Sequence, residues 1–258
     1  MTPTHAASRL VSAAYEGRIL SGIVRRLSTL REPYWRLCTR RSAPTREADF
    51  VRQAMLEASK GARNRPSDAV RRIEGMSGQR YRTFINTLIS LLGDDARYLE
   101  VGSWKGSTLA SAIEGNRCCA VCIDNWSEFG GPKDEFLRNI GAIRTSANLK
   151  VIEADFRKVD YSALGIFNVF MFDGPHEEID QYDGLMLAQP ALANPHVLIV
   201  DDWNWRRVRV GTFRAIHDSG WRIMHAQEVR TTLDDSHPLL AGTLSDWHNG
   251  YLMAALSR

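Results

Sequence analysis

The sequence lacks any long apolar run. No stretch of its 258 residues approaches the roughly 20 uninterrupted apolar residues that a membrane-spanning helix needs. It also shows no compact apolar segment followed by a small-residue cleavage site near its start, so we expect no secretory signal. Cysteine is scarce, with four residues and no disulfide pattern, which suits a reducing compartment. These absences predict a cytoplasmic protein without a transmembrane segment.

A complete zinc site is also missing. Cys119 and Cys122 have the spacing of a metal knuckle, but no second pair of cysteine or histidine residues accompanies them. The remaining cysteines are Cys38 and Cys118. We therefore interpret Cys118–Ile123 as an apolar strand that carries small buried thiols.

Basic residues are concentrated at one end of the chain. The formal net charge is +3, yet residues 1–46 contain nine arginines against Glu16 and Glu32, a balance of +7. The other residues therefore sum to 3 − 7 = −4. Because the basic character is confined to this arm, a nucleic acid is disfavoured as the substrate of the remaining chain.

The arm itself has one apolar stripe. Leu20, Ile23, Leu27 and Leu30 recur at helical spacing until Pro33 interrupts the pattern, so a helix is expected. It could pack on its own domain or on a partner subunit in a homo-oligomer. Its arginine face could instead make a weak peripheral contact with anionic lipid, or bind an acidic substrate. An arginine-rich start also resembles an organellar transit peptide.

From residue 98 onward, short apolar runs alternate with amphipathic stretches. The predicted strands are 98–101, 119–123, 149–152, 167–172, 197–200, 221–225 and 251–256. The predicted helices are 48–62, 78–92, 105–114, 132–144, 179–192 and 208–219, with a short helix capped by Ser67. This order predicts an α/β fold with a doubly wound, mainly parallel, Rossmann-like sheet and helices on both faces. The last two strands could pair antiparallel at one edge.

The chain is expected to have three parts. Residues 1–46 form a basic N-terminal arm, predicted to be helical. Residues 47–93 form a helical layer, and residues 94–258 form the α/β domain.

A glycine turn follows the first strand of the α/β domain. Gly102 and Gly106 bracket this turn, and Ser107 begins the next helix. Such a turn lets the backbone approach a cofactor, and the helix offers unpaired N–H groups. A dinucleotide site would need a second glycine where Trp104 stands, and a pyrophosphate would avoid the carboxylate of Glu100. A cofactor with a cationic, amino-acid-like end suits this turn better.

Acidic residues follow every strand of the predicted parallel sheet. Ligands bind outside the carboxyl ends of such strands, so these residues mark the expected site. The strand ends are Glu100-Val-Gly102, Asp124-Asn-Trp126, Glu153-Ala-Asp-Phe156, Asp173-Gly-Pro-His176 and Asp201-Asp-Trp203. Asp124 lies 24 residues after Glu100, close to where a ribose diol would be held.

This ordered set resembles the S-adenosylmethionine (SAM) motifs of class I methyltransferases. The segment Glu100-Val-Gly-Ser-Trp-Lys-Gly-Ser-Thr108 is similar to the form found in the macrocin and mycinamicin sugar O-methyltransferases and the cephamycin-pathway protein. Asp173-Gly-Pro-His176 and Asp201-Asp202 are similar to further elements of that subgroup. The resemblance covers about residues 95–225.

The resemblance implies a role for each matching residue. Around SAM it places Glu100, Gly102, Ser103, Gly106, Ser107, Asp124, Asn125, Trp126, Asp155, Phe156 and Asp173. It implies a divalent cation, Mg²⁺ or another, on Asp173, Asp201 and Asp202, and His176 as the general base. The implied reaction is O-methylation of a hydroxyl on a small molecule, sugar or glycan.

Elementary chemistry is compatible with these roles but leaves alternatives. Mg²⁺ prefers carboxylate oxygens, and coordination lowers the pKa of a bound hydroxyl. Adjacent Asp201 and Asp202 cannot point the same way in an extended strand, so one could be structural. Two other readings stay open: a metal-independent methyltransferase with His176 as its base, and a non-catalytic subunit that binds SAM or another nucleoside. Trp203-Asn-Trp-Arg-Arg207 could contact a sugar or an anionic planar acceptor, or could simply be a packed loop.

Overall fold

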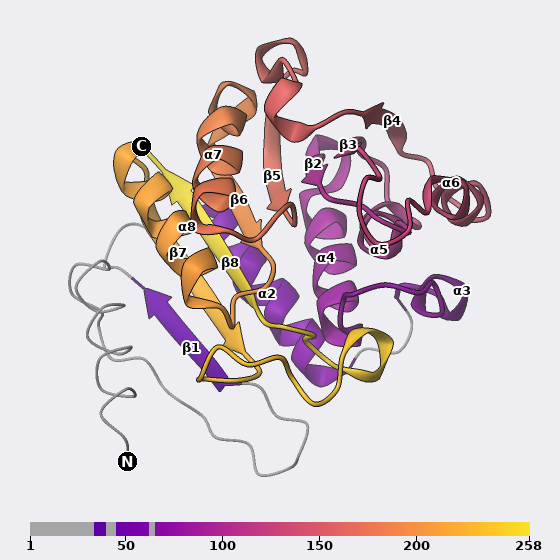
Figure 1. Cartoon of the computed structure of the whole chain (residues 1–258), viewed down its shortest axis with the longest axis horizontal. Coiled ribbons are helices and arrows are strands. Elements are labelled where there is room, and N and C mark those ends of the chain that lie inside the picture. Colours follow the sequence, from indigo (N-terminus) through magenta and orange to yellow (C-terminus); the bar gives the residue numbers. More distant parts are fainter. Residues whose placement is uncertain (1–33, 40–44, 62–64) are drawn as a thin grey trace.

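The computed structural model describes residues 34–39, 45–61 and 65–258, with the backbone alone for residues 34–39. Its centre is an eight-stranded sheet with the order β1-β7-β8-β6-β5-β2-β3-β4 (Figure 1). The strands are β1 (Tyr34–Thr39), β2 (Arg97–Val101), β3 (Cys119–Asp124), β4 (Asn148–Glu153), β5 (Phe167–Phe172), β6 (Leu192–Val200), β7 (Arg222–Arg230) and β8 (Tyr251–Ser257). Neighbouring strands from β4 to β6 are parallel, which confirms the predicted doubly wound, mainly parallel sheet.

Helices cover both faces of the sheet, as predicted. They are α2 (Arg46–Lys60), α3 (Asp68–Arg71), α4 (Gln79–Leu92), α5 (Ser107–Ile113), α6 (Lys133–Gly141), α7 (Glu178–Ala188) and α8 (Arg206–Asp218). Alternate residues of β2 point to opposite faces, as the pleat requires. Tyr98 packs in the core with α2, α4 and α5, whereas Leu99 packs in the core with α7 and α8.

The buried strand β5 shows why the sheet forms here. Its sequence Phe-Asn-Val-Phe-Met-Phe is apolar on both faces, and all of its residues except Asn168 are fully buried. Phe170 and Phe172 enter one core, and Val169 and Met171 enter the other. A strand covered on both sides is typical of parallel sheets. β5 therefore fixes the centre of the molecule and the position of Asp173, the residue after it.

Local capping explains where the N-terminal helices begin. Thr45 accepts a hydrogen bond from Ala48 N at 3.1 Å at the start of α2, and Ser67 accepts one from Val70 N at 3.4 Å at the start of α3. Gly61 ends α2 in a left-handed conformation. The predicted helices in residues 47–93 are thus present, and α2 and α4 pack directly on the sheet.

The strand arrangement differs from the prediction at one edge. β7 and β8 pair antiparallel as expected, but β8 lies between β6 and β7, so it is not an edge strand. The edge belongs to β1, which pairs antiparallel with β7. Residues 34–39 are therefore a strand and not part of a helical arm, because the unpaired edge of β7 offers backbone partners to the extended segment after Pro33. The helix expected before Pro33 lies outside the described residues.

Among the described helices, none combines the length and the apolar character needed to span a membrane.

Candidate active site

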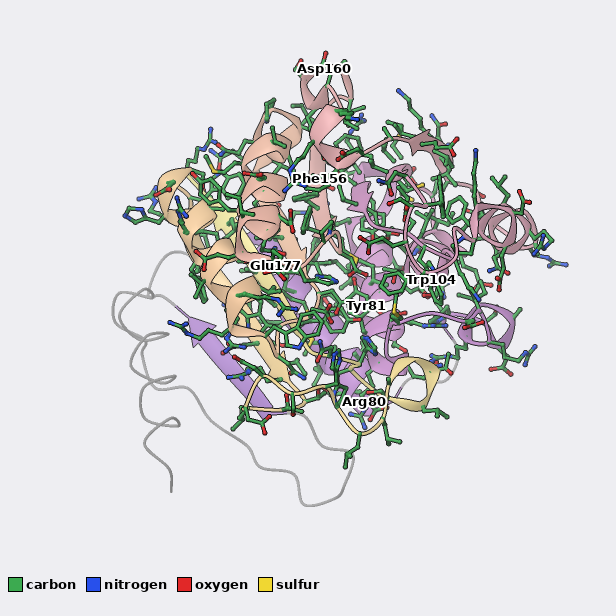
Figure 2. All side chains as sticks on the ribbon, viewed as in Figure 1. Arg80, Tyr81, Trp104, Phe156, Asp160 and Glu177 are labelled. Atoms are coloured by element: carbon green, nitrogen blue, oxygen red, sulfur yellow. The ribbon has the colours of Figure 1, made fainter. Side chains whose placement is uncertain are left out.

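The carboxyl ends of β2, β3, β4 and β5 enclose a cavity of about 210 Å³. Eight residues predicted for the site line it: Gly102, Asp124, Asn125, Trp126, Asp155, Phe156, Asp173 and His176. In Figure 2, Trp104 appears on one side of this region and Glu177, next to His176, on the other, with Tyr81 between them in the view. The structure thus brings most of the predicted strand-end residues to one place.

The glycine turn is shaped by the protein's own packing. Gly102 has φ +85°, and a Cβ atom there would lie 1.8 Å from the carbonyl oxygen of Asp173. Gly106 has φ +83°, and a Cβ atom there would lie 2.9 Å from the ring of Phe136. Both positions require glycine for conformation and for space. Gly102 therefore lets the turn after β2 contact the end of β5, and both segments line the cavity.

Asp124 fixes this turn from the neighbouring strand. Its Oδ2 accepts hydrogen bonds from the backbone N–H groups of Ser103 at 2.7 Å and Trp104 at 2.8 Å. Its Oδ1 accepts one from Trp126 N at 2.6 Å. A carboxylate has about four lone-pair sites, so the side chain can still accept from a ligand hydroxyl. Asp124 thus anchors the turn and also faces the cavity where a ribose diol was expected.

Glu100 lies beneath the turn and does not line the cavity. Its side chain is fully buried, accepts a hydrogen bond from Ser103 Oγ at 2.7 Å and accepts another from Tyr98 Oη. Burial raises the pKa of Glu100 to about 7, although both hydrogen bonds act in the opposite direction. The expected contact between Glu100 and the cationic end of a cofactor is therefore not seen in the cavity wall.

Three other predicted cofactor residues support the turn from behind. Ser103 is buried against Glu100, and the Oγ atoms of Ser107 and Ser77 lie 3.0 Å apart. Gly106 packs on α6 through Phe136. Ser103, Gly106 and Ser107 are absent from the cavity wall, so the two serine hydroxyls and the close packing at Gly106 position the backbone of the turn.

Aromatic rings form the far end of the cavity. Phe156 packs edge-on against Phe172 with ring centroids 5.4 Å apart, and the guanidinium of Arg157 lies 4.4 Å from its ring centroid. Trp126 donates from Nε1 to the Trp104 carbonyl at 2.8 Å. Phe129 completes this wall and is 65% exposed. An apolar slot with nearby Asp155 and Asn125 has the composition expected for a planar base.

At the other end, His176 is held by Asp202. His176 Nε2 lies 2.8 Å from Asp202 Oδ2, and Asn249 Nδ2 donates to Asp202 Oδ1 at 2.7 Å. Burial alone would raise the pKa of Asp202, but hydrogen bonding to His176 and Asn249 lowers it, so this carboxyl is ionised at neutral pH. A carboxylate only accepts hydrogen bonds, so Nε2 is the nitrogen that carries the proton in the neutral imidazole, and Nδ1 then has the lone pair.

The two adjacent aspartates after β6 point to different partners. Asp202 has φ +52°, an uncommon left-handed conformation that turns its carboxylate toward His176. Asp201 is instead hydrogen-bonded to Asp173, and burial together with the neighbouring carboxylates raises the pKa of both. The two neighbouring carboxylates therefore disfavour full ionisation of this pair.

The side chains of Asp173, Asp201 and Asp202 were expected to bind a divalent cation. Both oxygens of Asp202 are engaged by protein groups, and Asp201 Oδ1 accepts from Asp202 N at 2.7 Å. Within the described ranges, no group of three or more histidine, cysteine or acidic side chains is placed to hold a metal ion. The three predicted ligands are close together, but their donor atoms do not converge on a cation site, and the divalent cation is not supported.

The segment after Asp202 places one half-buried ring beside His176. Trp203 is fully buried and donates from Nε1 to Glu228 at 2.7 Å, so it belongs to the core. Trp205 packs edge-on against His176, with ring centroids 5.4 Å apart. Arg207 lies over the Trp205 ring and donates from Nε to the His176 carbonyl at 2.9 Å. Trp205 and Arg207 therefore position the loop that carries His176.

The sequence pattern did not identify several residues of the site. Met76, Trp104 and Phe129 line the cavity, and Asn249 supports Asp202 from 47 positions along the chain. The only local signals were the tryptophan inside the glycine turn and a phenylalanine directly before two glycines. Nothing in the sequence near Asn249 connects it to Asp202.

Comparison with known proteins gives distant structural matches. No protein-family model and no curated protein sequence matches the chain. TrmN from Thermus thermophilus is similar at 12% identity and a TM-score of 0.49, over 73% of this chain and 51% of that protein. The O-methyltransferase from Bacillus cereus in complex with SAH is similar at 13% identity and a TM-score of 0.46, over 83% of this chain and 92% of that protein. The chain thus spans about half the length of the Thermus protein.

Proposed function

We propose that the protein is a SAM-dependent methyltransferase that transfers a methyl group to a hydroxyl of a small molecule, sugar or glycan. The observation that carries the proposal is the pair His176–Asp202, whose side chains lie 2.8 Å apart, with His176 in the cavity wall. Bound SAM would supply a methyl group on a positively charged sulfur. A hydroxyl acceptor needs a base to remove its proton, and the cavity ends at one.

The residues present fit this cofactor. The cavity offers a carboxylate at Asp124 for a diol and an apolar wall at Phe156 for a planar base. The turn at Gly102 brings the end of β2 against the end of β5. The residues expected to hold the cofactor and His176 therefore line the same cavity. Holding donor and acceptor together in this way removes much of the entropic cost of the reaction.

The chemical step depends on the orientation of the His176 ring. Asp202 holds the proton of Nε2, so the lone pair of Nδ1 is free to accept the proton of the acceptor hydroxyl. The nearby negative charge of Asp202 stabilises the imidazolium that forms, and Asn249 keeps Asp202 in place. General base catalysis of this kind contributes roughly 10²- to 10⁴-fold to a rate.

Calorimetry and activity measurements test this proposal. We expect SAM to bind the full chain, with its affinity nearly unchanged in His176→Ala and Asp202→Asn. Methyl transfer from labelled SAM to a panel of neutral hydroxylated compounds should fall roughly 10²-fold or more in both variants. His217→Ala is the matched control, because His217 is 80% exposed on α8 and distant in sequence from the cavity residues. Failure of SAM to bind would refute the cofactor assignment.

A cation-assisted reaction is a second candidate, favoured by one observation. Burial and the neighbouring carboxylates raise the pKa of Asp173 and of Asp201, and the charge of a cation would relieve this repulsion, although their donor atoms do not converge on a cation site in the structure. Activity that is lost on EDTA treatment and restored by Mg²⁺, together with loss in Asp201→Asn, would establish this version. Activity that is unchanged by EDTA would leave His176 as the base without a metal.

A further inference from the structure

The long connection between β7 and β8 contains a second cavity, which we call the loop cavity. It has a volume of about 260 Å³. Its wall consists of Thr231, Thr232, Ser236, His237, Pro238, Leu239, Leu240, Leu244, Ser245 and Asp246. In Figure 1 this connection, in orange to yellow, runs below the helices and strands that carry the candidate active site.

The loop cavity begins one aromatic ring away from His176. Trp205 packs edge-on against His176 on one side, at 5.4 Å between centroids, and against His237 on the other, at 5.0 Å. His237 belongs to the cavity wall. The loop is also linked to His176 by hydrogen bonds. Asn249 donates to Asp202, which contacts His176, and Asn249 accepts from Asn204 at 2.8 Å. Asn204 in turn accepts from Thr231 N at 2.9 Å, at the edge of the cavity.

The wall mixes apolar side chains with mostly uncharged polar ones. Leu239 is 93% exposed and Leu244 is 72% exposed, although leucines usually gain by leaving water. Apart from His237, the only ionisable wall residue is Asp246, which is paired with Arg80 at 3.0 Å. No lysine or arginine belongs to the wall. Such a surface suits an uncharged molecule with an apolar part, and it offers no lysine or arginine to pair with a phosphate or carboxylate.

We propose that the loop cavity holds the apolar body of the methyl acceptor while the acceptor's hydroxyl reaches His176. This inference rests on the proposed methyltransferase function and narrows its substrate class to neutral hydroxylated small molecules with an apolar part. A cavity of about 260 Å³ holds a small organic group and not a folded partner. The exposed leucines are then the contact surface for the acceptor.

A matched ligand series tests the assignment with the full chain. The probes are hexyl β-glucoside, methyl β-glucoside and glucose 6-phosphate, which share sugar hydroxyls but differ in apolar tail and charge. Binding is measured by ligand-observed NMR titration in the presence of SAH. We expect hexyl β-glucoside to bind at least roughly tenfold more tightly than the other two, since each buried CH₂ contributes about 0.8 kcal/mol.

Two variants place the binding in the loop cavity. Leu239→Ser combined with Leu244→Ser should weaken hexyl β-glucoside binding roughly fivefold or more, because the tail then meets hydroxyl groups. Leu56→Ser is the matched control, since Leu56 is 55% exposed on α2. Equal binding of the hexyl and methyl glucosides, tighter binding of glucose 6-phosphate, or an unaffected double variant would overturn the proposal. A dimer that dissociates in the double variant would also overturn it, because a second copy would then cover the leucines.

SAM calorimetry separates this inference from the proposed function. The double leucine variant should bind SAM as the natural sequence does, because neither leucine lines the first cavity. Loss of the hexyl preference with intact SAM binding would refute the loop cavity alone. Absence of SAM binding in the natural sequence would refute the methyltransferase, whatever the glucosides do.

Discussion

Replacing Glu100 with glutamine should make the stability of the protein less dependent on pH. Burial raises the pKa of Glu100 from 4.5 to about 7 in the folded protein. Between these two values the folded protein binds more protons than the unfolded chain. The free energy of unfolding therefore falls as the pH rises through this window and levels off above about pH 7. Glutamine resembles the protonated carboxyl and carries no titrating group.

The size of the effect follows from the two pKa values. A rise from 4.5 to about 7 corresponds to about 3 kcal/mol at about 1.4 kcal/mol per pKa unit. Part of this fall in the free energy of unfolding has already occurred at about pH 5.5. The stability of the natural sequence therefore falls by about 2 kcal/mol between about pH 5.5 and about pH 8.5. Relative to the natural sequence, Glu100→Gln should therefore gain about 2 kcal/mol of stability across this range.

Urea unfolding at the two pH values measures this double difference. Constant effects of the substitution, such as altered hydrogen bonds to Tyr98 and Ser103, cancel in it. Glu178→Gln is the control, because Glu178 has a side chain that is 48% exposed on α7. A double difference below about 0.5 kcal/mol, or one of opposite sign, would refute the argument that Glu100 is protonated in the folded protein at mildly acidic pH.

Two further substitutions test the geometry of the site. Gly102→Ala should destabilise the fold by roughly 3 kcal/mol or more, because the new Cβ would lie 1.8 Å from the Asp173 carbonyl and φ is +85°; thermal unfolding measures this, and a normal melting temperature would contradict it. Asn249→Ala should lower kcat roughly tenfold with SAM affinity retained, because Asp202 loses a charge-assisted hydrogen bond; a change in SAM affinity with normal kcat would show that Asn249 acts elsewhere.

Most of the fold could be predicted from the pattern of apolar strands in the sequence. The apolar run of β5 coincides with the predicted strand 167–172, and the acidic strand ends meet at one cavity because parallel strands share a carboxyl edge. β1 could not be predicted, because it forms by pairing with β7, about 190 positions away in the sequence. Long-range pairing of this kind leaves no local signal.

The sequence predicted which residues belong to the candidate site better than it predicted where their side chains point. His176 and the cavity residues Asp124 and Phe156 were named from the sequence. The burial of Glu100 was not, because both faces of β2 are covered and the strand pattern does not show which side chain faces a ligand. The left-handed conformation of Asp202 also has no sequence signature, yet it separates the partners of Asp201 and Asp202.

The close contact between Gly102 and the Asp173 carbonyl limits which parts of the molecule can be altered. It joins the glycine turn after β2 to the backbone at the end of β5. A side chain at position 102 would collide with the Asp173 carbonyl, so the spacing between these two segments cannot be adjusted there without disturbing the fold. The connection between β7 and β8 carries no such constraint at its exposed leucines. Under the proposed assignment of the loop cavity to the acceptor, acceptor range should therefore be changed at Leu239 and Leu244, with the sheet and the turn left intact.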